Sequence, residues 1–102
     1  PALKLDNAKL VRKIGDTGTG TFLADGPVEI TANASLEIDA TALTNQQAGK
    51  FTLLEYTGER TGDFDAAKVT LKGVAQPDHW KLRWVGKKLK FSYAKGFSII
   101  VR

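Results

Sequence analysis

Alternation of apolar and polar residues along short runs is the feature that most constrains the fold of this chain. Apolar side chains recur at every second position in five runs, 28–31, 36–39, 68–72, 80–84 and 88–93. Because successive side chains of a β-strand point to opposite faces, each run predicts a strand with one buried and one solvated face. Weaker strand signals occur at 3–5, 10–14, 21–23 and 51–56, and a run apolar enough to be buried on both faces occurs at 97–101.

The residues between these runs indicate the same fold class. Glycine, proline, asparagine and aspartate separate the runs, for example at 15–18, 25–27 and 76–78, and these residue types favour turns. No window predicts a long amphipathic helix, although residues 40–48 fit either a turn or two of helix or a polar loop. Many short strands with regular turns predict an all-β fold.

Two architectures agree with this pattern. We expect a β-solenoid (parallel β-helix) or a solenoid-cap segment that ends in an antiparallel hairpin, and an antiparallel β-sandwich is the alternative. The length suits a single β-rich domain, residues 1–102. Since the chain contains no Met, we expect a processed piece or the C-terminal part of a longer protein. No run of about 18 apolar residues is present that could span a membrane as a helix.

Residues 80–93 predict the clearest pair of strands. Gly86 and Lys87 lie between two alternating runs, and glycine at the first central position suits a two-residue type II′ turn. The residue pairs that this turn dictates share one apolar face: Trp84–Leu89, Leu82–Phe91 and Trp80–Tyr93. Core packing is the favoured interpretation of this face, because aromatic side chains bury large apolar areas.

The other face of this hairpin is basic. It places Arg83 opposite Lys90, with Lys81 and Lys88 nearby. Like charges directly opposite each other on a sheet are mildly destabilising. Acidic groups or an anionic ligand would therefore stabilise this stripe.

The formal net charge of +4 conceals three segments of alternating sign. Residues 1–15 carry +3, residues 16–66 carry −7 and residues 67–102 carry +8. A uniformly basic chain would suggest a nucleic acid or an anionic membrane as the partner. Segregation instead favours the acidic part of the same chain, or that of a neighbouring copy, and leaves no strong case for nucleic acid.

Residues with catalytic or metal-binding chemistry are scarce. The absence of Cys excludes thiol catalysis, disulfides and zinc-finger spacing. We expect His79, the one histidine, to be a surface or loop residue, because its sequence neighbour Asp78 does not place an orienting acid beside it. Weak candidates for calcium ligands are Glu59, Asp63 and Asp65, which are better interpreted as a solvated acidic turn. We expect neither catalysis nor a bound cofactor or metal.

Short motifs along most of the chain resemble a known family. In order, they are Gly20-Thr-Phe-Leu, Pro27-Val-Glu-Ile-Thr, Ala34-Ser-Leu-Glu-Ile-Asp, Gly49-Lys-Phe-Thr-Leu-Leu-Glu-Tyr and Thr61-Gly-Asp-Phe, followed by the hairpin at 80–93. This series resembles the C-terminal regions of secreted bacterial proteins with autotransporter-associated β-strand repeats and similar surface passengers. The resemblance implies a parallel β-helix or its terminal cap, secreted or on the surface of a bacterial cell, with a structural or adhesin-like role.

The leading functional hypothesis is a non-enzymatic structural domain that assembles through strand edges. The candidate edges run from Leu3 to Ile14 and from Phe97 to Val101, because an unpaired edge invites pairing with another chain. Its partners would be other copies of itself or the rest of a longer surface protein.

Two alternative functions remain open. Trp80, Trp84 and Tyr93 could form a carbohydrate-binding platform for a polysaccharide. The polyanion-binding alternative uses Lys81, Arg83, Lys88 and Lys90, and it predicts an affinity that falls steeply with salt.

Overall fold

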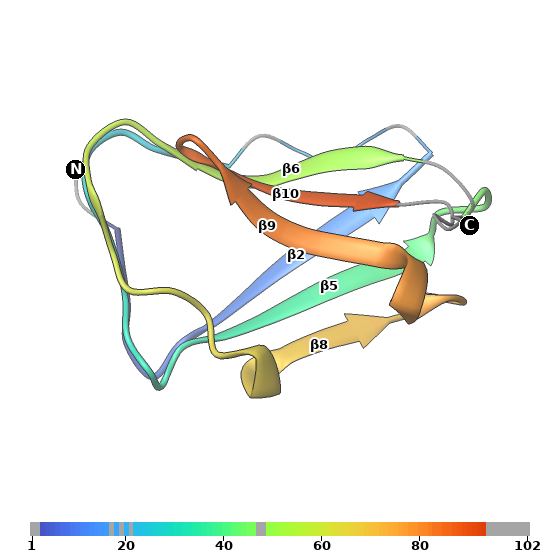
Figure 1. The fold of residues 1–102 in the computed structure, drawn as a ribbon, viewed down its shortest axis with the longest axis horizontal. Helices are drawn as coiled ribbons and strands as arrows, with labels where there is room; N and C mark the ends of the chain where they lie inside the picture. Colours follow the sequence, from blue (N-terminus) through green and yellow to red (C-terminus); the bar gives the residue numbers. More distant parts are fainter. Residues whose placement is uncertain (1–2, 17, 19, 21, 47–48, 94–102) are drawn as a thin grey trace, which may run out of the picture.

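The computed structural model describes residues 3–16, 18, 20, 22–46 and 49–93, and it confirms the prediction of an all-β fold (Figure 1). The strands are β1 (Leu3–Leu5), β2 (Lys9–Gly15), β3 (Leu23–Ala24), β4 (Val28–Ile30), β5 (Ser35–Ala42), β6 (Lys50–Tyr56), β7 (Arg60–Thr61), β8 (Val69–Lys72), β9 (Trp80–Val85) and β10 (Lys88–Tyr93). The helices of the described residues are two three-residue 3-10 turns, Ala66–Lys68 and Pro77–His79, and neither has the length or apolarity to cross a membrane.

Successive strands of the chain belong to three different sheets, in an order that repeats along the chain. The sheet orders are β1-β4-β7, β2-β5-β8 and β3-β6-β10-β9. We call β1, β2 and β3 the first pass, β4, β5 and β6 the second pass, and β7 with β8 the third pass. Among the described strands, every pairing between passes is parallel, whereas β10 pairs antiparallel with both β6 and β9. None of the three sheets closes on itself.

The core lies between the sheets, with the same face of each strand turned inward. Along the longest parallel sheet, Leu10 pairs with Leu36 and Leu36 pairs with Val69, so apolar residues stack from pass to pass. Leu36 and Ile38 of the central strand β5 are fully buried. Each such side chain contributes roughly 1.5–3 kcal/mol relative to exposure. In Figure 1 this sheet faces the layer formed by β6, β10 and β9.

The hairpin has the predicted register. Trp84 pairs with Leu89, Leu82 with Phe91 and Trp80 with Tyr93. Gly86 has a φ of 61°, and Lys87 does not share this positive φ, as a type II′ turn requires.

The largest differences between the expected and the observed strands occur in three places. Residues 40–42, expected to be helical or in a loop, continue β5, because Ala40 faces the core and is buried. β7 has only two residues, too few for alternation to reveal it. The third strand, expected at 21–23, comprises Leu23–Ala24. The apolar run from Phe97 to Val101 lies outside the described residues.

Opposite charges face each other between passes. Lys4 of β1 pairs with Glu29 of β4, and Lys13 of β2 pairs with Asp39 of β5. Lys9 forms an ion pair of 2.7 Å with Glu37. The acidic segment of the sequence therefore contacts the basic segment that precedes it, one of the two partners that charge segregation predicted.

The first and second passes each have three corners, the turns that follow their three strands. At each corner, a hydrogen bond between a threonine and an aspartate connects the second pass to the first. In all three corners the threonine hydroxyl of the second pass donates to an aspartate of the first pass, and the pairs are Thr31–Asp6 (3.0 Å), Thr44–Asp16 (2.8 Å) and Thr57–Asp25 (2.9 Å). The backbone N–H of Thr44 also donates to Asp16, and these two bonds lower the pKa of that carboxyl. These bonds fix the turns of one pass upon the turns of the next.

Gly58 occupies the closest approach between two passes. Its N–H donates to the carbonyl of Gly26 in the turn of the pass before, at 2.8 Å. A Cβ at position 58 would lie 2.6 Å from the backbone of Gly26 and Pro27, whereas a Cβ at Gly20 would meet nothing within 4 Å. Neither glycine has a positive φ, so the two positions differ in space and not in backbone strain.

We expect Gly58→Ala to lower the free energy of unfolding by about 1–3 kcal/mol, because the passes would have to separate. Gly20→Ala is the matched control and is expected to stay within about 1 kcal/mol of the parent. Urea denaturation followed by circular dichroism measures both. Equal stability of the two variants would contradict the close stacking of the turns.

Asp39 lies at the centre of a charge ladder on the outer face of β2, β5 and β8. Its neighbours in the register are Lys13 and Lys72. The backbone N–H and the hydroxyl of Thr41 both donate to Asp39 Oδ1, at 3.0 and 2.7 Å. These bonds and, to a smaller extent, the two lysines hold the pKa of Asp39 below its ordinary value.

A lowered pKa in the folded state stabilises the fold above the unfolded pKa, near 3.9, and this contribution disappears as the pH falls through the folded pKa. We therefore expect Asp39→Asn to be less stable than the parent at pH 7 and the difference to shrink below about pH 4. Urea denaturation at both pH values measures this difference. The control is Asp78→Asn, at an exposed position. A pH-independent difference for Asp39→Asn would contradict the role of its charge.

Candidate functional site

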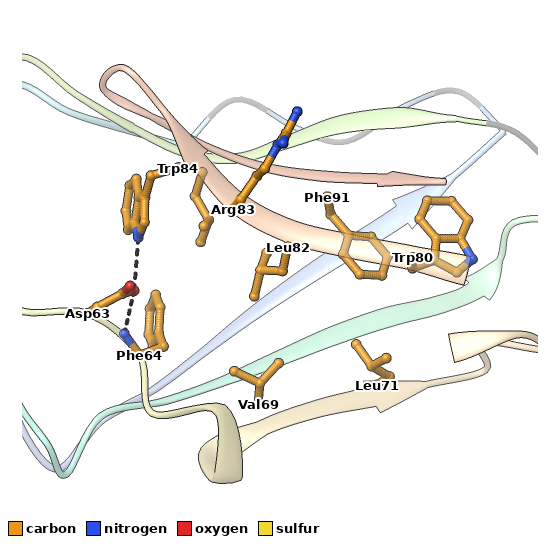
Figure 2. A pocket seen from close by; sticks show the side chains of 10 residues that line it. Asp63, Phe64, Val69, Leu71, Trp80, Leu82, Arg83, Trp84 and Phe91 are labelled. Atoms are coloured by element: carbon orange, nitrogen blue, oxygen red, sulfur yellow. Dashed lines mark hydrogen bonds between the residues drawn. The ribbon is translucent and has the colours of Figure 1, made fainter. Parts of the chain in front are cut away.

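The described residues line an apolar groove between β8 and the hairpin. Its volume is about 370 Å³, and its walls are Asp63, Phe64, Val69, Leu71, Trp80, Leu82, Arg83, Trp84, Leu89 and Phe91. Figure 2 shows Val69 and Leu71 of β8 pointing toward Leu82 of β9. Both β8 and β9 are end strands of their sheets, so the groove lies where the core reaches the end of the stack of passes.

A polar cluster closes one end of this groove. The Trp84 indole N–H donates to Asp63 Oδ1 at 2.9 Å, and the same oxygen accepts the N–H of Phe64 at 2.7 Å (Figure 2). The Arg60 guanidinium stacks on the Trp84 ring at 4.3 Å and lies 3.8 Å from Asp63 Oδ2. The cluster joins β9 to β7 and to the segment that follows β7. Neither β7 nor β8 pairs with β9.

The three aromatic residues considered for sugar binding do not form one exposed platform. Trp80 is 6% exposed and stacks on Phe91 with ring centroids 4.6 Å apart. Tyr93 is half-buried and stacks on His79 at 5.6 Å. Trp84 is half-buried at the opposite end of β9, in the polar cluster.

The four basic residues considered for polyanion binding lie on the other face of the hairpin. Arg83 pairs directly with Lys90, and in Figure 2 Arg83 points away from β8. Lys88 pairs with Glu55 of β6, so part of this stripe is compensated within the sheet. Carbohydrate binding and polyanion binding both stay predictions.

The acidic candidates serve local structure. Asp63 belongs to the polar cluster, and the Asp65 carboxylate accepts the N–H of Ala67 at 3.0 Å. Glu59 is exposed, and its backbone carbonyl accepts the N–H of Val28 at 2.8 Å. In the part of the chain that the structure describes, no three His, Cys, Asp or Glu side chains are grouped as a metal site would require.

The sequence pattern does not associate Arg60 and Asp63 with Trp84. The two segments are more than 20 residues apart, and β7 is too short to place Arg60 by alternation. No local pattern in the sequence links the segment of Arg60 and Asp63 to Trp84 of the hairpin. Comparison of the chain with protein-family models, curated protein sequences and solved structures found no match.

We expect the Asp63–Trp84 bond to couple the two residues energetically. A double-mutant cycle with Asp63→Ala and Trp84→Phe should give a coupling energy of about 1 kcal/mol, the usual net contribution of such a hydrogen bond. The control cycle pairs Trp84→Phe with Asp78→Ala and should give a coupling near zero. Denaturation in urea supplies the four free energies of each cycle, and equal couplings in the two cycles would refute the bond.

Proposed function

We propose that this chain is a non-enzymatic structural unit, a segment of β-solenoid that ends in a hairpin and belongs to a secreted or surface protein of bacteria. The observation on which the proposal depends most is the order of the parallel pairings. Val28 pairs with Leu3 of the pass before and with Arg60 of the pass after. Such stacking of whole passes is the defining geometry of solenoids, in which each repeat contacts only its neighbours.

The two ends of the stack differ. In the four-stranded sheet, β10 takes the place of a further parallel strand beside β6 and pairs antiparallel with it. The hairpin thereby ends the series of parallel strands. At the other end, no described strand pairs with the outer edges of β1, β2 and β3. An edge of this kind accepts a further strand by backbone hydrogen bonding.

The chemistry of the described side chains agrees with a structural role. Asp63 is the one carboxylate among the residues that line the groove, and it already accepts two hydrogen bonds. Acid–base catalysis on a glycan would require two carboxylates flanking the substrate. The motif resemblance to autotransporter-type passengers supports the cell-surface setting.

The test is to lengthen the stack. A copy of residues 28–59, which is one complete pass, is fused directly before Leu3, because Leu3 and Arg60 both pair with Val28 and are equivalent in register. We expect the added pass to fold and to protect the β2 amides from hydrogen exchange. The control carries the same 32 residues in scrambled order. Protection no greater than in this control would overturn the proposal.

A further inference from the structure

We propose that the outer edge of the first pass binds a β-strand whose outward-facing side chains are carboxylates, and that copies of this chain do not fill this position. The inference rests on the proposed function because it assumes that this edge accepts a further strand. It goes further by stating the sequence pattern of the strand that the edge selects.

The outer edge of the first pass exposes both backbone groups and apolar side chains. β2 is seven residues long and is an end strand of its sheet in the described part of the chain. Leu23 of β3, in the same pass, is 51% exposed, and Val11 of β2 is 41% exposed. These are two of the three large apolar residues found exposed among the described residues. An added strand would cover apolar surface as well as backbone groups.

The charges of the passes specify the partner. Across the sheet of β2, β5 and β8, Lys13 is in register with Asp39, and Asp39 with Lys72. The sign therefore alternates from basic to acidic to basic along the stack. Two further lysines of the first pass face acidic residues of the second pass: Lys4 is in register with Glu29, and Lys9 forms an ion pair with Glu37. A strand placed on the outer edge continues this alternation only if it is acidic, since opposite charges across strands are stabilising.

Among the described strands, a copy of this chain offers no such strand at an available edge. If β8 of one copy stacked on β2 of another in the register of the passes, Lys72 would face Lys13. If two copies paired β2 with β2 about a two-fold axis, the exposed Lys9 and Lys13 would lie among their own counterparts. Both arrangements oppose like charges. The acidic strand β5 is the central strand of its sheet and has no free edge.

The occupant is therefore a strand of another sequence, acidic at alternate positions. Its remaining positions are apolar, because they continue the inward face of Leu10 and Ile14, which are buried. Strand β5, which pairs with the opposite edge of β2, has this pattern in Leu36-Glu37-Ile38-Asp39.

Three fusions that differ only in charge test this selectivity. Each has a copy of residues 28–59 before Leu3, and the copy is either unchanged, neutral (Glu29→Gln, Glu37→Gln, Asp39→Asn) or basic (Glu29→Lys, Glu37→Lys, Asp39→Lys). Hydrogen exchange of the amides of residues 10–13 is measured at low salt and at 1 M salt. We expect about tenfold greater protection in the acidic than in the basic fusion, with the neutral fusion between them. The difference should nearly vanish at 1 M salt, where the Debye length is about 3 Å.

The outcomes separate this proposal from the proposed function. Equal protection in the three fusions would mean that the edge accepts a strand without regard to charge, which overturns the present proposal and leaves the proposed function standing. No protection in any of them would overturn both. Light scattering of the unfused chain at low salt is expected to give a monomer. Association that is lost on adding the acidic pass would show copies on the same edge and would also overturn the proposal.

Discussion

The backbone hydrogen bonds between successive passes are the constraint on which the rest of this structure depends. Parallel pairing places each residue beside one residue of the next pass, so a side chain that points inward in one pass must have an inward neighbour in the next. Leu10, Leu36 and Val69 satisfy this requirement in one sheet. The Thr–Asp bonds at the three corners and the close contact of Gly58 with Gly26 keep the passes in this register where the chain turns.

The same register determines the electrostatics of the outer faces. Because each strand has neighbours from the pass before and the pass after, a charge on the second pass can be in register with opposite charges on both sides. Asp39 does so with Lys13 and Lys72, and hydrogen bonds from Thr41 hold it ionised. A net charge of +4 thus describes the molecule poorly, since the basic residues of the first pass face acidic residues of the second.

The hairpin lies at the other end of the stack, where the series of parallel strands gives way to antiparallel pairing. Its two strands pair antiparallel, and on its apolar face Trp80 stacks on Phe91. The groove beside β8 remains because β8 and β9 belong to different sheets and do not pair. At one end of this groove, the side chains of Trp84, Asp63 and Arg60 join β9 to β7 and to the segment that follows β7.

Local pattern determined a large part of this fold. Period-two alternation determined the all-β class and most strands, and the Gly86 turn together with the apolar pattern determined the hairpin register, because both depend only on neighbouring residues. Alternation could not reveal β7, nor show that β5 continues through residues 40–42, since two-residue strands and small buried residues leave no period to detect. Which strands pair was decided only in three dimensions. Parallel neighbours lie a whole pass apart in the sequence, so the Asp63–Trp84 bond, the corner bonds and the charge ladder exist only once the passes have stacked.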